Sequence, residues 1–226
     1  MKNPVAIVLL SLAATAIAFA QDAPKVTITP QNDGLHIQGD SEHLKFTLGY
    51  PILSTGDKKK DYGNKGVEVK DNTATVKYEG GGELDIAVDA ATGTIVIKGQ
   101  NLPAEVASVS MRMIINQNFN VGGTYQFAGK EVQPFPEVKP DKPHLFQGNV
   151  ANVTIRAGDG KGLIFTVPLY SYQEITDMRE WGTNSFGWMT LANYSPDTAL
   201  TYKIEDAGAA PAAADGASTN AAPAMP

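Results

Sequence analysis

The stretch "GVEVKDNTATVKYEGGGELDIAVDAATGTIVIKGQ", residues 66–100, decides the fold class. Apolar and polar side chains alternate along it: Leu84, Ile86 and Val88 are separated by charged or small residues, as in half-buried strands. Glycines and the sequence Ala-Thr-Gly interrupt the alternation, and such residues favour tight turns. Each strand is therefore expected to pack one face and expose the other, as in antiparallel sheets.

The same signal continues on both sides of this stretch. Between Lys25 and Glu205, short runs rich in Val, Ile, Thr, Phe and Tyr are separated by Gly and Pro, which indicates about a dozen strands. The sequence shows no convincing helix and no internal repeat of fixed period. The sequence predicts one all-β domain over residues 21–206, an antiparallel β-sandwich of the jelly-roll or enlarged-sandwich type.

Two segments depart from simple alternation. In residues 105–121 apolar side chains fall on both faces of a strand, with Met111, Met113 and Ile115 on one face. Ile114 lies on the other face, beside Arg112 and Asn116. We predict a strand in the middle of the sandwich, covered on both faces, with a short helix as the alternative. Residues 133–146 carry four prolines and are expected to form a long connection across the outside of the domain.

Both ends of the chain differ in composition from the domain. Residues 1–20 combine Lys2, an apolar run and small residues around Phe19, the layout of a secretory signal cleaved after Ala20. We therefore expect a secreted or periplasmic protein without a membrane span. Residues 207–226 are mostly Ala, Pro, Gly and small polar residues, which predicts a disordered tail because little apolar surface is available for burial.

Charge and cysteine content narrow the function classes. The net charge of −6, without a basic stripe, argues against nucleic acid as a partner. The basic cluster at residues 58–65 is interpreted as a solvated loop, with contact to an acidic polymer or anionic surface as the alternative. Because cysteine is absent, disulfide and thiolate chemistry are excluded.

Catalytic and metal motifs are weak. His36 and His43, with Asp40 or Glu42, could approach one another across a hairpin, but their spacing does not fix a metal site. A calcium ion is possible but unsupported, because the Asp-Gly turns lack a dense oxygen-ligand pattern. Asp85 and Asp89 would lie roughly 13 Å apart along one strand, too far for a retaining glycosidase pair. We assign no catalytic residue, metal site or cofactor.

The run "YQEITDMREWGTNSFGW", residues 172–188, holds both tryptophans of the chain. A continuous pleat from Leu163 would bury Leu163, Phe165, Val167, Leu169 and Ile175 and would turn Tyr170, Tyr172 and Glu174 outward, unless Pro168 resets the register. Two tyrosines about 7 Å apart on a sheet face match successive sugar rings, which stack through their C–H faces.

The polar residues of this run suggest sugar recognition. Gln173, Arg179 and Asn184 offer planar groups that hydrogen-bond hydroxyls beside an aromatic platform. The alternative is a structural corner, in which Phe186 and Trp188 are core, Trp181 caps the sandwich and Arg179 bridges Asp177 and Glu180. Of the two tryptophans, we expect Trp188 to be structural and Trp181 to contact a ligand.

The strand "GLIFTVPLYSYQEITD" followed by "MREWG", residues 162–182, and then by a final aromatic strand resembles the sugar-facing strands of β-sandwich domains that accompany glycoside hydrolases and polysaccharide lyases, including galactose-mutarotase-like sandwiches. The resemblance covers about thirty residues and brings no catalytic motif with it. It implies a role in handling carbohydrate and nothing about individual catalytic residues.

These observations lead to three hypotheses. The first is a secreted or periplasmic protein that binds a polysaccharide or oligosaccharide without catalysis. Its expected ligand-binding residues are Tyr170, Tyr172, Gln173, Glu174, Arg179, Trp181, Asn184 and Trp188. The second is a structural or protein-interaction module of the cell envelope. The third is a glycan lyase or hydrolase that acts through Glu174, Asp177 or Tyr172.

Overall fold

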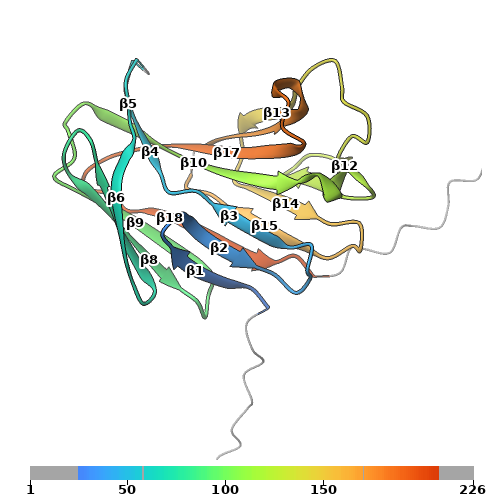
Figure 1. Cartoon of the computed structure of the whole chain (residues 1–226), viewed down its shortest axis with the longest axis horizontal. Coiled ribbons are helices and arrows are strands. Elements are labelled where there is room, and N and C mark those ends of the chain that lie inside the picture. The colour runs from blue at the N-terminus through green and yellow to red at the C-terminus, as the bar shows by residue number, and fades with distance from the viewer. Residues whose placement is uncertain (1–24, 58, 170, 209–226) are drawn as a thin grey trace, which may run out of the picture.

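The computed structural model describes residues 25–57, 59–169 and 171–208, which form two antiparallel sheets of nine strands each (Figure 1). The predicted all-β sandwich is confirmed. The expected signal segment and residues 209–226 of the expected tail lie outside the described residues. Ala207 and Gly208 are described, and their carbonyls accept hydrogen bonds from the Arg156 guanidinium. Among the described residues, no helix has the length and apolar character needed to cross a membrane.

The first sheet, sheet A, contains the strands that carry the candidate site. Its path is β1 (Thr27–Gln31), β2 (Gly34–Gln38), β3 (Lys45–Leu48), β10 (Val106–Asn116), β17 (Ser185–Asn193), β16 (Tyr172–Asp177) and β13 (His144–Asn149). Off this path, β4 (Ile52–Thr55) pairs with β10 and with β5 (Asp61–Tyr62). The central pair, β10 and β17, aligns from Ser108 opposite Asn193 to Asn116 opposite Ser185.

The second sheet, sheet B, contains the stretch that decided the fold class. Its order is β12 (Gln133–Pro134), β11 (Thr124–Phe127), β14 (Asn152–Arg156), β15 (Gly162–Thr166), β18 (Leu200–Asp206), β9 (Thr94–Gln100), β8 (Glu83–Asp89), β7 (Thr73–Tyr78) and β6 (Asn64–Lys70). Strands β6 to β9 pair consecutively, and the inner residues Leu84 and Ile86 are buried. The turn before β9 needs Gly93, because φ is +66° and a Cβ atom would lie 2.1 Å from the Ile204 carbonyl oxygen.

The core lies between the inner faces of the two sheets. The Phe165 ring of sheet B packs against Phe46 and Trp188 of sheet A, with ring centroids 6.0 and 5.3 Å apart. The Trp188 side chain is 1% exposed, so its expected structural role agrees with its position. Phe135, in the proline-rich segment, is also buried and packs against Phe186 at 4.8 Å. That connection is therefore anchored in the core rather than lying wholly outside the domain.

The segment 105–121 forms the predicted strand, so the helical alternative is wrong, and a short 3-10 helix, η1 (Gln117–Asn120), follows it. The expectation that β10 is covered on both faces is wrong for its C-terminal half. Its inner residues, such as Met113 and Ile115, are buried, whereas Ile114 is 55% exposed. From Arg112 to Asn116 strand β10 therefore presents an uncovered outer face to solvent, whereas Ser108 and Ser110 on the same face are buried.

The continuous pleat predicted from Leu163 to Ile175 is wrong, because the chain changes sheets in between. Strand β15 belongs to sheet B and β16 to sheet A. At the crossing, the Ser171 Oγ donates to the Pro168 carbonyl at 2.7 Å, and Leu169 is 80% exposed instead of buried. Proline cannot donate to a sheet ladder, which explains why the strand ends there. Tyr170 lies outside the described residues.

Candidate functional site

The outer face of sheet A carries two adjoining surface pockets. Along β10 every second side chain points to this face, from Ser108 through Arg112 to Asn116, because successive strand residues alternate between faces. The first pocket lies over β3, β10 and the start of β17, and we call it the β3 pocket. The second lies over β4, β5, β10, β17, β16 and β13, and we call it the β16 pocket.

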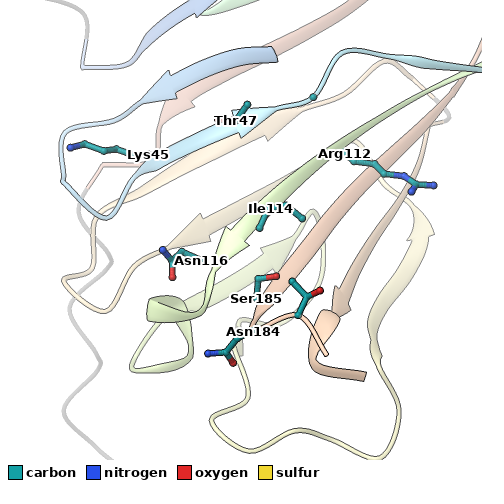
Figure 2. Close-up of a pocket in the computed structure, with 9 residues that line it drawn as sticks. Lys45, Thr47, Arg112, Ile114, Asn116, Asn184 and Ser185 are labelled. Carbon is teal, nitrogen blue, oxygen red and sulfur yellow. The ribbon is translucent and has the colours of Figure 1, made fainter. Parts of the chain in front are cut away.

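The β3 pocket has a volume of about 580 Å³. Its lining residues are Lys45, Thr47, Gly49, Arg112, Ile114, Asn116, Thr183, Asn184 and Ser185. Figure 2 shows the labelled side chains on three segments: β3, β10, and the chain entering β17. The half-exposed Ile114 lies between Arg112 and Asn116 along β10, so an apolar surface is flanked by two polar groups.

The β16 pocket has a volume of about 570 Å³. Its lining residues are Ser54, Asp61, Ser108, Ser110, Arg112, Asn149, Tyr172, Met189 and Leu191. Strand register explains much of this set, since Leu191 aligns with Ser110 on one side and with Tyr172 on the other. Small serines on the β4 and β10 side, opposite the larger Tyr172, leave a depression in the sheet surface.

Arg112 lines both pockets and is the point where they adjoin. It is exposed, and within the described ranges its guanidinium makes no hydrogen bond and no ion pair. The Asn149 side-chain amide likewise has no hydrogen-bond partner among described residues. Asp61 accepts a hydrogen bond from the Ser54 hydroxyl at 2.6 Å through one carboxylate oxygen. The pockets therefore present donors and acceptors that the fold itself does not use.

Beside the β16 pocket, Glu174 is held by four neighbouring side chains. Its carboxylate accepts hydrogen bonds from Thr176 at 2.6 Å, Tyr172 at 2.9 Å and Gln147 at 3.0 Å. The His144 Nδ1 atom lies 3.4 Å from its Oε1 atom. This cluster fixes the Tyr172 ring at the edge of the pocket.

The pKa values in this cluster follow from those contacts. Partial burial favours a higher Glu174 pKa, but the hydrogen bonds from Thr176, Gln147 and Tyr172 outweigh it and lower the pKa. Burial, with the hydrogen bond to the carboxylate second, raises the pKa of Tyr172 to about 12. At neutral pH the pair is therefore an ionised carboxylate and a neutral phenol.

The corner after β16 contains a tightly satisfied ion pair. In the 3-10 helix η2 (Met178–Trp181), Arg179 Nε donates to Asp177 Oδ1 at 2.9 Å, and its guanidinium donates to the carbonyls of Pro136 and Glu137. Burial alone would raise the Asp177 pKa, but hydrogen bonds from Arg179 lower it. Arg179 thus links η2 to the proline-rich segment, and its guanidinium is not available to hydrogen-bond a sugar.

Two further predicted ligand residues lie in the interior. Gln173 is fully buried and Trp188 is 1% exposed. The indole Nε1 of Trp188 donates to Gln173 Oε1 at 3.0 Å, and Gln173 Nε2 donates to the Val150 carbonyl at 2.9 Å. Their polar atoms satisfy one another inside the sandwich, so both residues are removed from the ligand-contacting set.

The other predicted residues reach the surface at different places. Tyr172 and Asn184 line the β16 and β3 pockets respectively, and Glu174 lies directly beside Tyr172. Trp181 is 58% exposed at the end of η2 and lines neither pocket. The expected bridge from Arg179 to Glu180 is replaced by a Lys139–Glu180 ion pair of 2.6 Å.

Sequence reasoning missed the residue that the two pockets share. The alternation in residues 105–121 already assigned Arg112 and Ile114 to one strand face, but that face was taken to be covered. Lys45, Asp61 and Asn149 gave no local signal, since long-range pairing alone brings them to this surface. As for the metal hypotheses, no group of three His, Asp or Glu side chains in the described chain could hold a metal ion.

Comparison with known proteins shows a likeness of fold alone. No family model matches the chain, and no curated protein matches it in sequence. The α-N-acetylgalactosaminidase NagBb from Bifidobacterium bifidum, solved as a GalNAc complex, is similar to it with a TM-score of 0.56 and 10% identity. That alignment covers 82% of this chain and 35% of that enzyme. The chain therefore has the fold of about a third of a carbohydrate-active enzyme.

Two weaker structural matches carry no argument of their own. The structure HI1317 aligns over 80% of this chain and 91% of its own, with a TM-score of 0.44 and 7% identity. A GH31 family sulfoquinovosidase from E. rectale, in complex with an aza-sugar inhibitor, aligns over 78% of this chain and 32% of its own, with a TM-score of 0.42 and 9% identity.

Proposed function

We propose that this chain is an exported protein that binds a polysaccharide or oligosaccharide without catalysis, on the outer face of sheet A. The observation that carries the proposal is the pair of pockets that adjoin at Arg112. Each combines an apolar surface with polar groups that have no partner in the fold. Sugars have this mixed character, with apolar C–H faces and hydroxyls at the ring edge.

The apolar and polar parts alternate across the pockets in a way that suits linked sugar rings. Ile114 offers an apolar contact in the β3 pocket, and Met189, Leu191 and the Tyr172 ring offer others in the β16 pocket. Polar side chains stand at the edges, where they would hydrogen-bond hydroxyls. Two pockets that share one residue fit a chain of at least two sugar rings better than a single monosaccharide.

The fold adds support to this proposal. It is shared with part of an enzyme solved as a GalNAc complex, and β-sandwiches host many unrelated functions. The pocket residues are the main support for carbohydrate binding, and the shared fold is a secondary one.

Binding without turnover is favoured by the state of the carboxylates. A general acid needs a raised pKa, whereas the Glu174 pKa is lowered and its oxygens accept three hydrogen bonds. Release of new reducing ends or unsaturated products from a bound glycan would favour the lyase or hydrolase hypothesis instead.

Affinity electrophoresis of the full chain against a panel of neutral and acidic polysaccharides tests the proposal. We expect at least one polymer to retard the wild type, and Asn149→Ala or Tyr172→Ala to weaken that binding about tenfold, the effect of losing one good polar or stacking contact. Trp181→Ala, which changes an exposed aromatic outside both pockets, is the matched control.

The outcomes separate two positions for the site. Loss of binding in Trp181→Ala with full retention in Tyr172→Ala and Asn149→Ala would place the ligand at the η2 corner and overturn the assignment to the pockets. Failure of every polymer to retard the wild type would overturn carbohydrate binding itself.

A further inference from the structure

We infer that the glycan site continues past the β3 pocket to the β1 edge of sheet A and holds an extended polysaccharide segment of about five sugars. This inference rests on the proposed function and specifies the length of its ligand. It starts from a third surface pocket, of about 270 Å³, which lies over β1, β2 and β3. We call it the β2 pocket.

The β2 pocket is lined mainly by the outward side chains of three strands. The pleat buries Ile28 in β1 and turns Thr27 and Thr29 to the outer face. In the same way, β2 turns His36 outward between two buried residues. Cross-strand register joins the outward side chains into two polar rows. The rows are Thr29, His36 and Thr47, and Thr27, Gln38 and Lys45.

The three pockets adjoin one another in a single row on the outer face of sheet A. Lys45 and Thr47 line both the β2 pocket and the β3 pocket, and Arg112 lines both the β3 pocket and the β16 pocket. Figure 2 shows Lys45 and Arg112 at opposite ends of the β3 pocket, with their side chains pointing apart. The β3 pocket is therefore the middle of the row and adjoins one neighbour at each end.

The length of this row follows from the strand order. The row crosses six neighbouring strands, β1, β2, β3, β10, β17 and β16. Hydrogen-bonded strands lie about 4.8 Å apart, so the row spans roughly 24 Å. An extended glycan advances by about one such spacing per sugar, which gives room for about five sugars. A disaccharide or trisaccharide would leave part of the row empty.

Polar groups of the β2 pocket remain available to sugar hydroxyls. In the part of the chain that the structure describes, the side-chain hydroxyls of Thr27, Thr29 and Thr47 make no hydrogen bond. The Nε2 atom of His36 lies 2.9 Å from Asp33 Oδ1, which orients the ring and leaves its Nδ1 atom for a ligand. Because a hydroxyl both donates and accepts, these groups can pair with sugar hydroxyls in either sense. The β2 pocket therefore adds hydrogen-bonding positions to the apolar contacts of the other two pockets.

Isothermal titration of the full chain with oligosaccharide ladders tests the inference. The ladders are cello-, laminari-, xylo- and manno-oligosaccharides and oligogalacturonides, each running from the disaccharide to well beyond the length of the row. We expect the affinity for a recognised ladder to rise with each added sugar up to about five and then to level off, because further sugars extend past the row.

The variant is Thr29→Ala/His36→Ala, which removes two exposed side chains at the β1 end of the row. It should weaken hexasaccharide binding about tenfold and change trisaccharide binding by less than about twofold, because a trisaccharide fits the other two pockets. The matched control is His43→Ala/Thr201→Ala, an exposed histidine and an exposed strand threonine that line none of the three pockets. It should bind every member of the ladder as the wild type does.

Three results would overturn the inference. Affinity that levels off at two or three sugars, still sensitive to Tyr172→Ala, would leave the proposed function standing and remove the β2 pocket from the site. Affinity that rises to the hexasaccharide equally in the wild type and in Thr29→Ala/His36→Ala would place the added sugars elsewhere on the surface. Failure to bind any ladder or its parent polymer would remove the inference together with the proposed function.

Discussion

Two arginines on sheet A and its corner show how differently the same side chain is used. Arg179 donates to Asp177 and to the carbonyls of Pro136 and Glu137, and its side chain is only 13% exposed. Arg112 is exposed and makes no side-chain hydrogen bond or ion pair in the described part of the chain. The Arg179 guanidinium makes its hydrogen bonds within the fold, whereas the Arg112 guanidinium is available to bind a ligand.

The comparison teaches that polar density alone does not locate a binding site. The corner with Asp177, Arg179 and Trp181 is richer in charged and aromatic residues than the surface around Arg112. Its polar atoms are already paired, however, so a ligand would have to displace contacts that stabilise the domain. The site is better sought where donors and acceptors are exposed and unpaired.

The largest effect on stability is expected from Arg179→Ala. The change leaves the fully buried Asp177 carboxylate without its counter-ion and releases the two carbonyls of the proline-rich segment. Breaking such a pair typically costs about 3 kcal/mol or more of unfolding free energy. Urea unfolding measures the loss, while glycan binding of the folded variant should stay within about twofold of the wild type.

Arg179→Lys is the matched control, because it keeps the charge but not the planar fork and should recover only part of the stability. A loss of unfolding free energy below about 1 kcal/mol in Arg179→Ala would show that the Arg179 contacts do not stabilise the domain as expected.

A smaller, pH-dependent effect is expected from Asp177→Asn. Because hydrogen bonds from Arg179 hold the Asp177 pKa below its ordinary value, the ionised carboxylate stabilises the folded state. That contribution is complete above the unfolded-chain pKa of about 3.9 and is lost as the pH falls through the folded pKa. The wild type should therefore exceed Asp177→Asn most clearly above about pH 5, and the difference should shrink towards about pH 2.

Urea titrations over this range measure the difference in unfolding free energy. Asp141→Asn, a change at an exposed aspartate, is the control and should follow the wild type at every pH. A difference for Asp177→Asn that stays constant with pH would contradict the role of its charge.

The fold class was predictable because it depends on local alternation. Residues such as Leu84 and Ile86 already show which face of their strand is buried, and the structure places them in the core. The change of sheet at Pro168 was harder to predict, because a proline ends a strand but does not say which sheet the next strand joins. For that reason Leu169 was assigned to the core and lies 80% exposed.

The candidate site was only partly predictable, and parity explains which part. From Tyr172 onward the alternation turned Tyr172 and Glu174 outward, and the same alternation places Gln173 with Ile175 on the inner face. The inward position of Gln173 could thus have been deduced from the pleat alone. Its bond with Trp188 could not, since it depends on the alignment of β16 with β17.

The smallest effect on stability is expected from Arg112→Gln, in direct contrast to Arg179→Ala. Since the Arg112 guanidinium contacts no partner among the described residues, its replacement should change the unfolding free energy by less than about 0.5 kcal/mol. Binding of a polysaccharide that the wild type retains should nevertheless weaken about tenfold, because the side chain shared by both pockets loses its charged donors. Urea unfolding and affinity electrophoresis on the same preparation measure both quantities. A loss of 2 kcal/mol or more, roughly the cost of breaking a buried contact, would mean that Arg112 belongs with Arg179 as a structural tie. We therefore expect opposite results for the two arginines: Arg179→Ala should be unstable but bind normally, and Arg112→Gln should be stable but bind weakly. That contrast would identify Arg179 as structural and Arg112 as ligand-binding.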